Sequence, residues 1–273
     1  MPTKSKPKSP IIIRSCKIMR LPEEKLIKAA ATAIGLNHFN APPISHMRRA
    51  MPGVALHPSR IAVMTKKYWG LGGVKLTVGF MDDPPADLRK RLLRHMNAWG
   101  KYGNVVFVET KHNPQVRISR STPAPDDGYW SYEGTDILHI DEDEPTMNLD
   151  GFTMKTPDSE FYRVVRHETG HTLGFPHEHM RTEIINKIDV EKAIAYFKRT
   201  EGWKKKDVIE QVLTPIENSA LMSTEKVDPQ SVMCYWLPGT IMKDRKPVVG
   251  GTNIDAMDAR FVARIYPKKR SSK

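Results

Sequence analysis

The sequence has few of the features that mark a secreted or membrane-bound protein. Its 273 residues include two cysteines, Cys16 and Cys234, so at most one disulfide can form and a disulfide-stapled secreted scaffold is excluded. No Asn-x-Ser/Thr glycosylation site occurs. The apolar run 11–13 is far shorter than the core of a signal peptide, and no run approaches the roughly 18 residues of a membrane span. We expect a soluble protein that is cytoplasmic or exported by a non-standard route.

Positive charge is concentrated at the two ends of the chain. The net charge is +12, and residues 1–60 hold eleven Lys or Arg against two acidic residues. Residues 268–273 hold four basic and no acidic residues, which leaves the stretch between them close to neutral. A nucleic-acid-binding domain would carry its basic residues on the folded body. We therefore interpret the ends as solvated extensions, with a surface-binding or targeting role as the alternative.

The most informative stretch reads His-Glu-Thr-Gly-His-Thr-Leu-Gly-Phe-Pro-His, from His167 to His177. His167 and His171 lie four residues apart, so on a helix both imidazoles face one point, where they could bind one metal ion. His177 would be about 9 Å further along a continued helix, too far to join them. The helix must therefore end before His177, and Gly174 is the residue that suits a left-handed helix end.

Three neutral imidazoles leave a fourth zinc position open for water, which is typical of catalytic rather than structural zinc. Zinc lowers the pKa of such a water from about 16 to about 7. Glu168 follows the first histidine and is placed to take the proton as a general base. The plainer interpretation, surface histidines on an amphipathic helix, does not explain the glycine and the third histidine at these spacings.

At this point the sequence resembles a known family. His-Glu-x-x-His-x-x-Gly-x-x-His is the signature of the metzincin metallopeptidases, and Glu178 after the third histidine is similar to the astacin branch. The stretch 231–235, Ser-Val-Met-Cys-Tyr, resembles the astacin form of the Met-turn. Further similarity to microbial astacin-like proteases lies at 130–132 and 143–149, so the resemblance extends over roughly residues 60–267.

The resemblance implies roles for several residues. One catalytic zinc ion would be held by His167, His171 and His177. Met233 would form an apolar floor beneath them, and Tyr235 would be a further zinc ligand at rest that stabilises the oxyanion during attack. Glu178 matches the residue that binds the freed N-terminus in mature astacins. His179 is expected at the surface or behind the ligands, and Cys234 stands where astacins commonly have His.

The family also implies an α+β fold with two lobes. The N-terminal lobe would hold a mixed twisted sheet and the zinc-binding helix, and the C-terminal lobe would be mostly helical with the Met-turn. Periodicity predicts strands at 74–80, 105–109 and 115–119, further strands within 128–140, and helices at 23–34, 86–102, 159–173, 189–200, 204–213 and 255–266. Asp158 or Ser159 should cap the zinc helix.

The domain organisation follows from these assignments. We expect a basic N-terminal extension at 1–59 that could serve as a pro-segment, the peptidase domain at 60–267, and a basic tail at 268–273. Cys16 could in principle bind zinc in a latent form. Because neither the matrixin cysteine motif nor the Phe-x-Gly-Asp switch of astacin propeptides is visible, we expect Cys16 to be an ordinary thiol.

The expected function is a zinc-dependent metalloendopeptidase, a monomer acting on peptide or protein substrates. In this family the substrate lies antiparallel to an exposed edge strand, and Trp130, Ser131 and Tyr132 are candidates for that neighbourhood, unless Trp130 is simply part of the core. Residues 141–144 could bind calcium, although a solvated acidic turn explains them as well. The competing function is a catalytically inactive zinc-binding module whose basic tails recruit nucleic acid or a membrane surface.

Overall fold

The structure, a computed structural model, describes residues 16–42, 62, 64–123, 127–215 and 227–269. A six-stranded sheet forms one part, in the order β1-β5-β6-β4-β2-β3. The strands are β1 (Cys16–Met19), β2 (Val74–Phe80), β3 (Val105–Glu109), β4 (Val116–Ser119), β5 (Tyr129–Tyr132) and β6 (Met147–Leu149). Strands β2, β3, β4 and β6 run parallel, β5 pairs antiparallel with β6, and β1 pairs parallel with β5.

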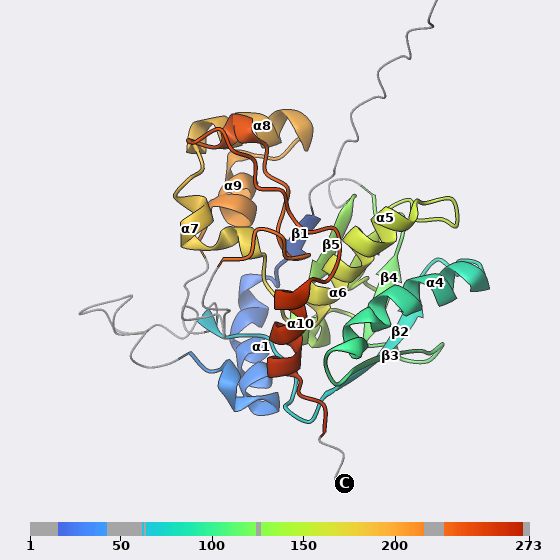
Figure 1. The fold of residues 1–273 in the computed structure, drawn as a ribbon. Helices are drawn as coiled ribbons and strands as arrows, with labels where there is room; N and C mark the ends of the chain where they lie inside the picture. The colour runs from blue at the N-terminus through green and yellow to red at the C-terminus, as the bar shows by residue number, and fades with distance from the viewer. Residues whose placement is uncertain (1–15, 43–61, 63, 124–126, 216–226, 270–273) are drawn as a thin grey trace, which may run out of the picture.

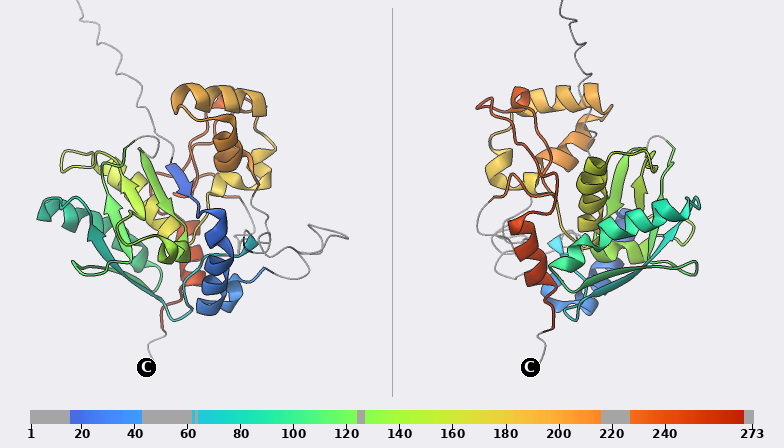
Figure 2. Two further views of the ribbon diagram at one scale, coloured as in Figure 1. Left: turned by 180° about the vertical axis from the view of Figure 1, so that it is seen from behind. Right: turned by 45° about the vertical axis from the view of Figure 1, so that its right-hand side comes forward.

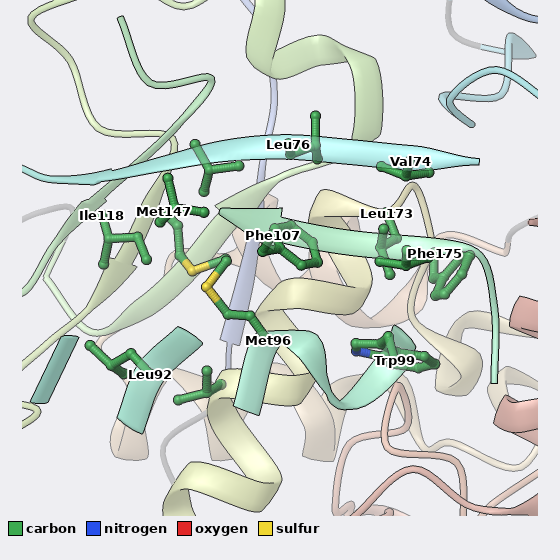
Figure 3. Close-up of a cluster of buried hydrophobic side chains, with 14 of the residues drawn as sticks. Val74, Leu76, Leu92, Met96, Trp99, Phe107, Ile118, Met147, Leu173 and Phe175 are labelled. Atoms are coloured by element: carbon green, nitrogen blue, oxygen red, sulfur yellow. The ribbon is translucent and has the colours of Figure 1, made fainter. Parts of the chain in front are cut away.

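Two helices cover one face of the sheet (Figure 2). Helix α4 (Ala86–Met96) continues into a 3-10 turn, Asn97–Lys101. Beside it lies the predicted zinc helix, which is three consecutive pieces: α5 (Asp158–Glu160), a π-helical turn (Phe161–Val165) and α6 (Arg166–Thr172). Trp99, Leu92 and Met96 of the first helix are fully buried against the sheet, as Figure 3 shows. This packing holds α6 still relative to the strands.

The remaining helices form a second lobe and a closing element. The lobe contains α7 (Thr182–Ile185), α8 (Val190–Thr200) and α9 (Lys205–Val208), and α9 runs into a second π-helical turn, Ile209–Leu213. These elements have their own hydrophobic core, separate from the core under the sheet. Helix α10 (Ala256–Ile265) returns to the first core (Figure 1).

The N-terminal segment packs on the body of the protein. Helix α1 (Glu23–Leu36) lies against the 3-10 helix Gly134–His139. A short 3-10 turn (His38–Asn40) follows α1. The buried side chain of its last residue, Asn40, donates to the Tyr68 carbonyl at 2.7 Å and accepts from the Tyr68 amide at 3.0 Å. Strand β1 lies between β5 and the second lobe in Figures 1 and 2. No helix among the described residues is long and apolar enough to cross a membrane.

Three local predictions differ from the structure. Within 128–140 only Tyr129–Tyr132 is a strand, and Gly134–His139 is helical. The zinc helix has no side-chain cap: Pro157 stands at the N-cap, and the Asp158 carboxylate pairs instead with Arg91 at 2.7 Å. Strands β1 and β6 were not predicted, because each has only three or four residues and is defined by distant pairing partners.

Candidate metal centre

The histidine segment folds as its spacing predicts. Helix α6 ends at Thr172, and Gly174 takes a positive φ of 87°. The Gly174 amide donates to the His171 carbonyl at 2.7 Å, and the Phe175 amide donates to the Gly170 carbonyl at 2.9 Å. This pair of bonds is a Schellman motif. A Cβ at position 174 would also lie 2.9 Å from the Lys67 carbonyl oxygen, so glycine is required here for both conformation and space.

The turn brings the third imidazole back to the first two. The Nε2 atoms of His171 and His167 lie 3.0 Å apart, those of His171 and His177 3.0 Å, and those of His177 and His167 3.2 Å. Nitrogens bound to one zinc at about 2 Å and tetrahedral angles would be roughly 3.3 Å apart. The three side chains therefore converge at the spacing that a shared metal ion needs.

The protonation of the imidazoles provides a test of this fit. His167 Nδ1 lies 2.6 Å from the Val232 carbonyl oxygen, and His171 Nδ1 lies 2.7 Å from that of Phe175. A carbonyl only accepts, so each Nδ1 carries the proton and each neutral ring presents a lone pair at Nε2. Lone pairs facing each other at 3.0 Å repel unless a cation lies between them. The donor set therefore fits zinc.

Burial keeps these rings neutral. The three histidine side chains are at most 6% exposed. Burial lowers the pKa of His167 to about 4 and holds the pKa values of His171 and His177 well below the usual range. At neutral pH no proton competes for the metal-facing nitrogens, which favours metal binding.

Glu168 lies beside the imidazoles with one oxygen satisfied and one not. Ser131 Oγ donates to Glu168 Oε2 at 2.8 Å, while Oε1 is buried without a hydrogen-bond partner. Burial raises the pKa of Glu168 to about 7, although interactions with Cys16 and Ser131 and the charge of Arg163 act in the opposite direction. A carboxylate whose pKa is near neutrality can both accept and return a proton.

Tyr235 completes this side of the centre. Its ring centroid lies 4.3 Å from that of His177 and 4.1 Å from that of His179, with which it stacks. Burial raises the pKa of the Tyr235 hydroxyl well above its usual value, and the neighbouring Cys16 and Glu168 act in the same direction. His179 is fully buried and not at the surface, and its Nε2 donates to the Gln211 carbonyl at 3.1 Å.

The stretch 231–235, which contains Met233, contacts α10 through hydrogen bonds and α6 through packing. Asp258, at the start of α10, accepts from Ser231 Oγ at 2.6 Å and from the Val232 amide at 2.9 Å. A Cβ at Gly170 would lie 2.3 Å from Met233 Sδ, so the thioether packs directly on the backbone of α6. The sequence did not indicate Asp258, because it is 26 residues from Val232 and acts only through the folded chain.

Cys16 is a buried thiol that lies much closer to the histidines than the sequence indicated. Its Sγ lies 3.6 Å from His177 Nε2, and Cys16 with the three histidines forms the one group of potential ligands found among the described residues, all within 4.8 Å of one another. Strand β1 holds Cys16 opposite Tyr129 of β5. The absence of a known cysteine motif was a poor guide, since strand pairing places the thiol at the centre whatever its neighbours are.

Comparison with known proteins decides the family. No family model matches the sequence. Over 136 residues, 49% of this chain, it is 29% identical to the zinc metalloproteinase nas-27 of Caenorhabditis elegans, and the match spans 28% of that protein's length. The structure of myroilysin is similar with a TM-score of 0.68 and 30% identity, covering 75% of this chain and 97% of that one. The chain belongs to the astacin-like metzincins. A second structure of myroilysin gives a TM-score of 0.56 at 31% identity, covering 74% and 86% of the two chains.

The expected α+β fold is confirmed. The structure also shows where the candidates for the substrate-binding edge strand lie. Trp130 is buried, so of the three edge candidates it belongs to the core, while Ser131 contacts Glu168. Strand β5 is flanked by β1, so it is not an edge in this structure. A cavity of about 60 Å³ adjoins the centre and is lined by, among others, His167, Glu168, Tyr129, Arg163, Trp236 and both cysteines.

The acidic turn 141–144 contains a cation from the protein itself. The Arg117 guanidinium donates to the backbone carbonyls of Ile140, Asp141 and Glu144 at 2.7 to 3.1 Å. Backbone carbonyls of this kind can also bind calcium, but here the guanidinium already occupies them. The turn is therefore organised by an arginine.

Glu178 lies next to the stretch 231–235, where its amide donates to the Met233 carbonyl at 2.9 Å. Its carboxylate accepts from the Asp228 amide at 2.9 Å and pairs with Arg181 at 3.3 Å. Burial raises the pKa of Glu178 to about 7. Glu178, Asp228 and Asp258 together line a cavity of about 40 Å³.

Proposed function

We propose that the protein is a zinc-dependent endopeptidase that hydrolyses peptide bonds and is latent while β1 occupies its cleft. The observation that carries the proposal is the convergence of three buried imidazole Nε2 atoms within 3.2 Å of one another, beside a buried carboxylate with an unsatisfied oxygen. A structural zinc site needs no base beside it. Membership of a zinc metalloprotease family supports the same function.

Each residue then has a defined task. His167, His171 and His177 would hold the zinc ion, which when bound would supply Lewis acidity to a water and to a substrate carbonyl. Glu168 takes the proton of the attacking water at Oε1 and returns it to the leaving amine, while Ser131 keeps the carboxylate oriented. The Tyr235 hydroxyl donates to the oxyanion of the tetrahedral intermediate. Met233 supports the histidines from below by packing on α6.

The proposal also covers the domain organisation: the N-terminal segment keeps the peptidase latent. Residues 1–59 are a pro-segment, 60–267 the peptidase domain and 268–273 a tail. When zinc is bound, Cys16 would supply a fourth ligand in the place that water needs. Burial raises the pKa of the Cys16 thiol well above its usual value, and a metal ion at the centre offsets this effect by favouring the thiolate.

Strand direction explains why the latent segment is not itself cut. A substrate of this family lies antiparallel to the strand beside the metal, whereas β1 is parallel to β5. The backbone carbonyls and amides of β1 therefore run past Glu168 in the reverse order. A reversed peptide cannot present its carbonyl and its leaving nitrogen to the groups that act on them.

The test compares the full chain with Cys16→Ser, a change of one atom that removes the thiol ligand. We expect one zinc per protein in both by elemental analysis. Casein cleavage should be at least tenfold faster in Cys16→Ser, which corresponds to about 1.4 kcal/mol of blocking interaction. A zinc chelator should abolish it and added zinc should restore it. Zinc-loaded Cys16→Ser that leaves casein and a random peptide library intact would refute the peptidase, and a non-catalytic metal-binding module would then explain the site.

A further inference from the structure

The strand β1 is held along both of its edges. On one edge it pairs with β5, with Ile18 opposite Ser131. On the other edge the Ile18 amide donates to Gln211 Oε1 at 3.0 Å, and Gln211 Nε2 donates to the Ile18 carbonyl at 3.0 Å. The Gln211 side chain thus behaves like a neighbouring strand. The cleft is a slot one strand wide, with β5 on one wall and Gln211 on the other.

Gln211 is held rigidly enough to serve as a wall. It lies in the π-helical turn Ile209–Leu213, where Val212 is fully buried. The Gln211 carbonyl accepts from His179 Nε2 at 3.1 Å, and His179 stacks on Tyr235. Insertions of this kind in helices are frequent at functional sites. The main chain of Gln211 is therefore connected through one histidine to the neighbourhood of the metal centre.

The register places this contact relative to the bond that would be cut. Cys16 lies at the metal centre and Ile18 lies two residues further along, towards the Tyr132 end of β5. A substrate antiparallel to β5 would enter at the Tyr132 end and leave at the Tyr129 end. The position now held by Ile18 would then be occupied by a substrate residue on the amino side of the scissile bond, about two residues from it.

A carboxamide can pair with a peptide running in either direction. It presents one acceptor and one pair of donors side by side, which match the C=O and N–H of one extended residue. Reversing the strand exchanges the positions of that N–H and C=O. Rotating the terminal torsion of the glutamine by 180° exchanges its oxygen and nitrogen in the same way. One residue can therefore hold β1 first and an opposed substrate afterwards.

We propose that Gln211 is a backbone clamp that binds the main chain of the segment in the cleft, β1 in the latent protein and the amino-side arm of the substrate in the active one. The substrate half rests on the proposed peptidase function. The clamp contacts only the peptide main chain and so does not select among side chains. It does require an extended residue with a free N–H. It therefore disfavours proline or an N-methylated residue at that one position.

The first experiment measures kcat/KM in the Cys16→Ser background. A good peptide substrate is N-methylated in turn at each of the three residues before the scissile bond. At one position we expect a loss of roughly tenfold to a hundredfold, from two hydrogen bonds of ordinary strength. Gln211→Leu should lose a similar factor on the unmethylated peptide and become insensitive to methylation at that position. Glu210→Leu, on the same turn, should behave like the parent, and Gln211→Glu should not rescue the loss, because an ionised carboxylate cannot donate to the peptide carbonyl.

The second experiment uses the latent full chain and needs no catalysis. Hydrogen exchange at the Ile18 amide and maleimide labelling of Cys16 in the zinc-loaded protein should both be about tenfold faster or more in Gln211→Leu, and unchanged in Glu210→Leu. Unchanged exchange and labelling in Gln211→Leu overturn the clamp. An active enzyme whose kcat/KM ignores Gln211→Leu overturns its substrate half. Faster exchange in a protein that cleaves nothing refutes the peptidase function and leaves the clamp on β1 standing.

Discussion

The two halves of the metal centre are built in different ways. The histidine half comes from eleven consecutive residues on α6 and its C-terminal turn, and backbone carbonyls fix two of its three rings. The other half is the four-residue strand β1. Its Cys16 lies beside His177, from which it is separated by 161 residues in the sequence. The first half is locked by the helix and the Met-containing stretch beneath it. The second is held along its edges by β5 and Gln211 and at one end by Cys16 beside the histidines, and under the proposed latency it would leave without disturbing the first.

The largest expected effect tests whether catalysis depends on the histidine half, which we call the locked half. In the Cys16→Ser background, Glu168→Gln should reduce kcat by roughly 10²–10⁴-fold, because the amide cannot accept the proton. Zinc content should not change, since the carboxylate is not among the imidazole donors. The measurements are peptide turnover and elemental analysis. Turnover retained within tenfold would show that another group is the base.

The next effect tests how tightly the locked half is packed. Gly170→Ala would place a Cβ 2.3 Å from Met233 Sδ, so the thioether must move. We expect a loss of about 1–3 kcal/mol in the free energy of unfolding, a fall in the melting temperature of several degrees for a domain of this size.

A double-mutant cycle identifies the cause of that loss. In Met233→Ala the clash is absent, so adding Gly170→Ala should cost much less there than in the parent. Equal costs in the two backgrounds would mean that Met233 does not pack on α6 as described. Thermal unfolding of the zinc-loaded proteins gives both values.

The smallest effect concerns Ser131, which lies on β5 between the two halves. Its hydroxyl stabilises the charged form of Glu168 and so holds the pKa of that carboxyl down. In Ser131→Ala the pKa of Glu168 should rise, and the base should be protonated at a higher pH. The acid limb of the kcat profile should therefore move towards higher pH. We expect a loss of roughly threefold to tenfold at pH 6 that is smaller at pH 9.

A control distinguishes this pH effect from general damage. Thr169→Ser on the same helix trims a buried side chain whose hydroxyl bonds only the Val165 carbonyl, and should leave the profile in place. A uniform loss across the whole pH range in Ser131→Ala would contradict the role given to its hydroxyl.

The sequence predicted the locked half well because its information is local. Two histidines four residues apart, a glycine at the helix end and a third histidine define a turn whose geometry needs no other part of the chain. Gly174 adopts the left-handed conformation expected of it. The long strand 74–80 and the helices starting at 86, 190 and 256 were also predicted, since each carries a periodic apolar face.

The removable half could not be predicted in the same way. Cys16 has no local pattern around it, and its position depends on pairing with a strand more than a hundred residues away. Gln211 appeared only as part of an amphipathic helix. Nothing in its neighbours indicates that the helix loosens into a π-helical turn and aims the carboxamide at the backbone of β1.

The arginine inside the acidic turn has a consequence for how this protein tolerates its surroundings. A calcium ion in a loop is lost when the solution is dilute in calcium, whereas a guanidinium is covalently attached and stays charged at any ordinary pH. Arg117 therefore gives residues 140–144 a permanent internal counterion. We therefore expect the turn 140–144 to keep its shape without a bound calcium ion.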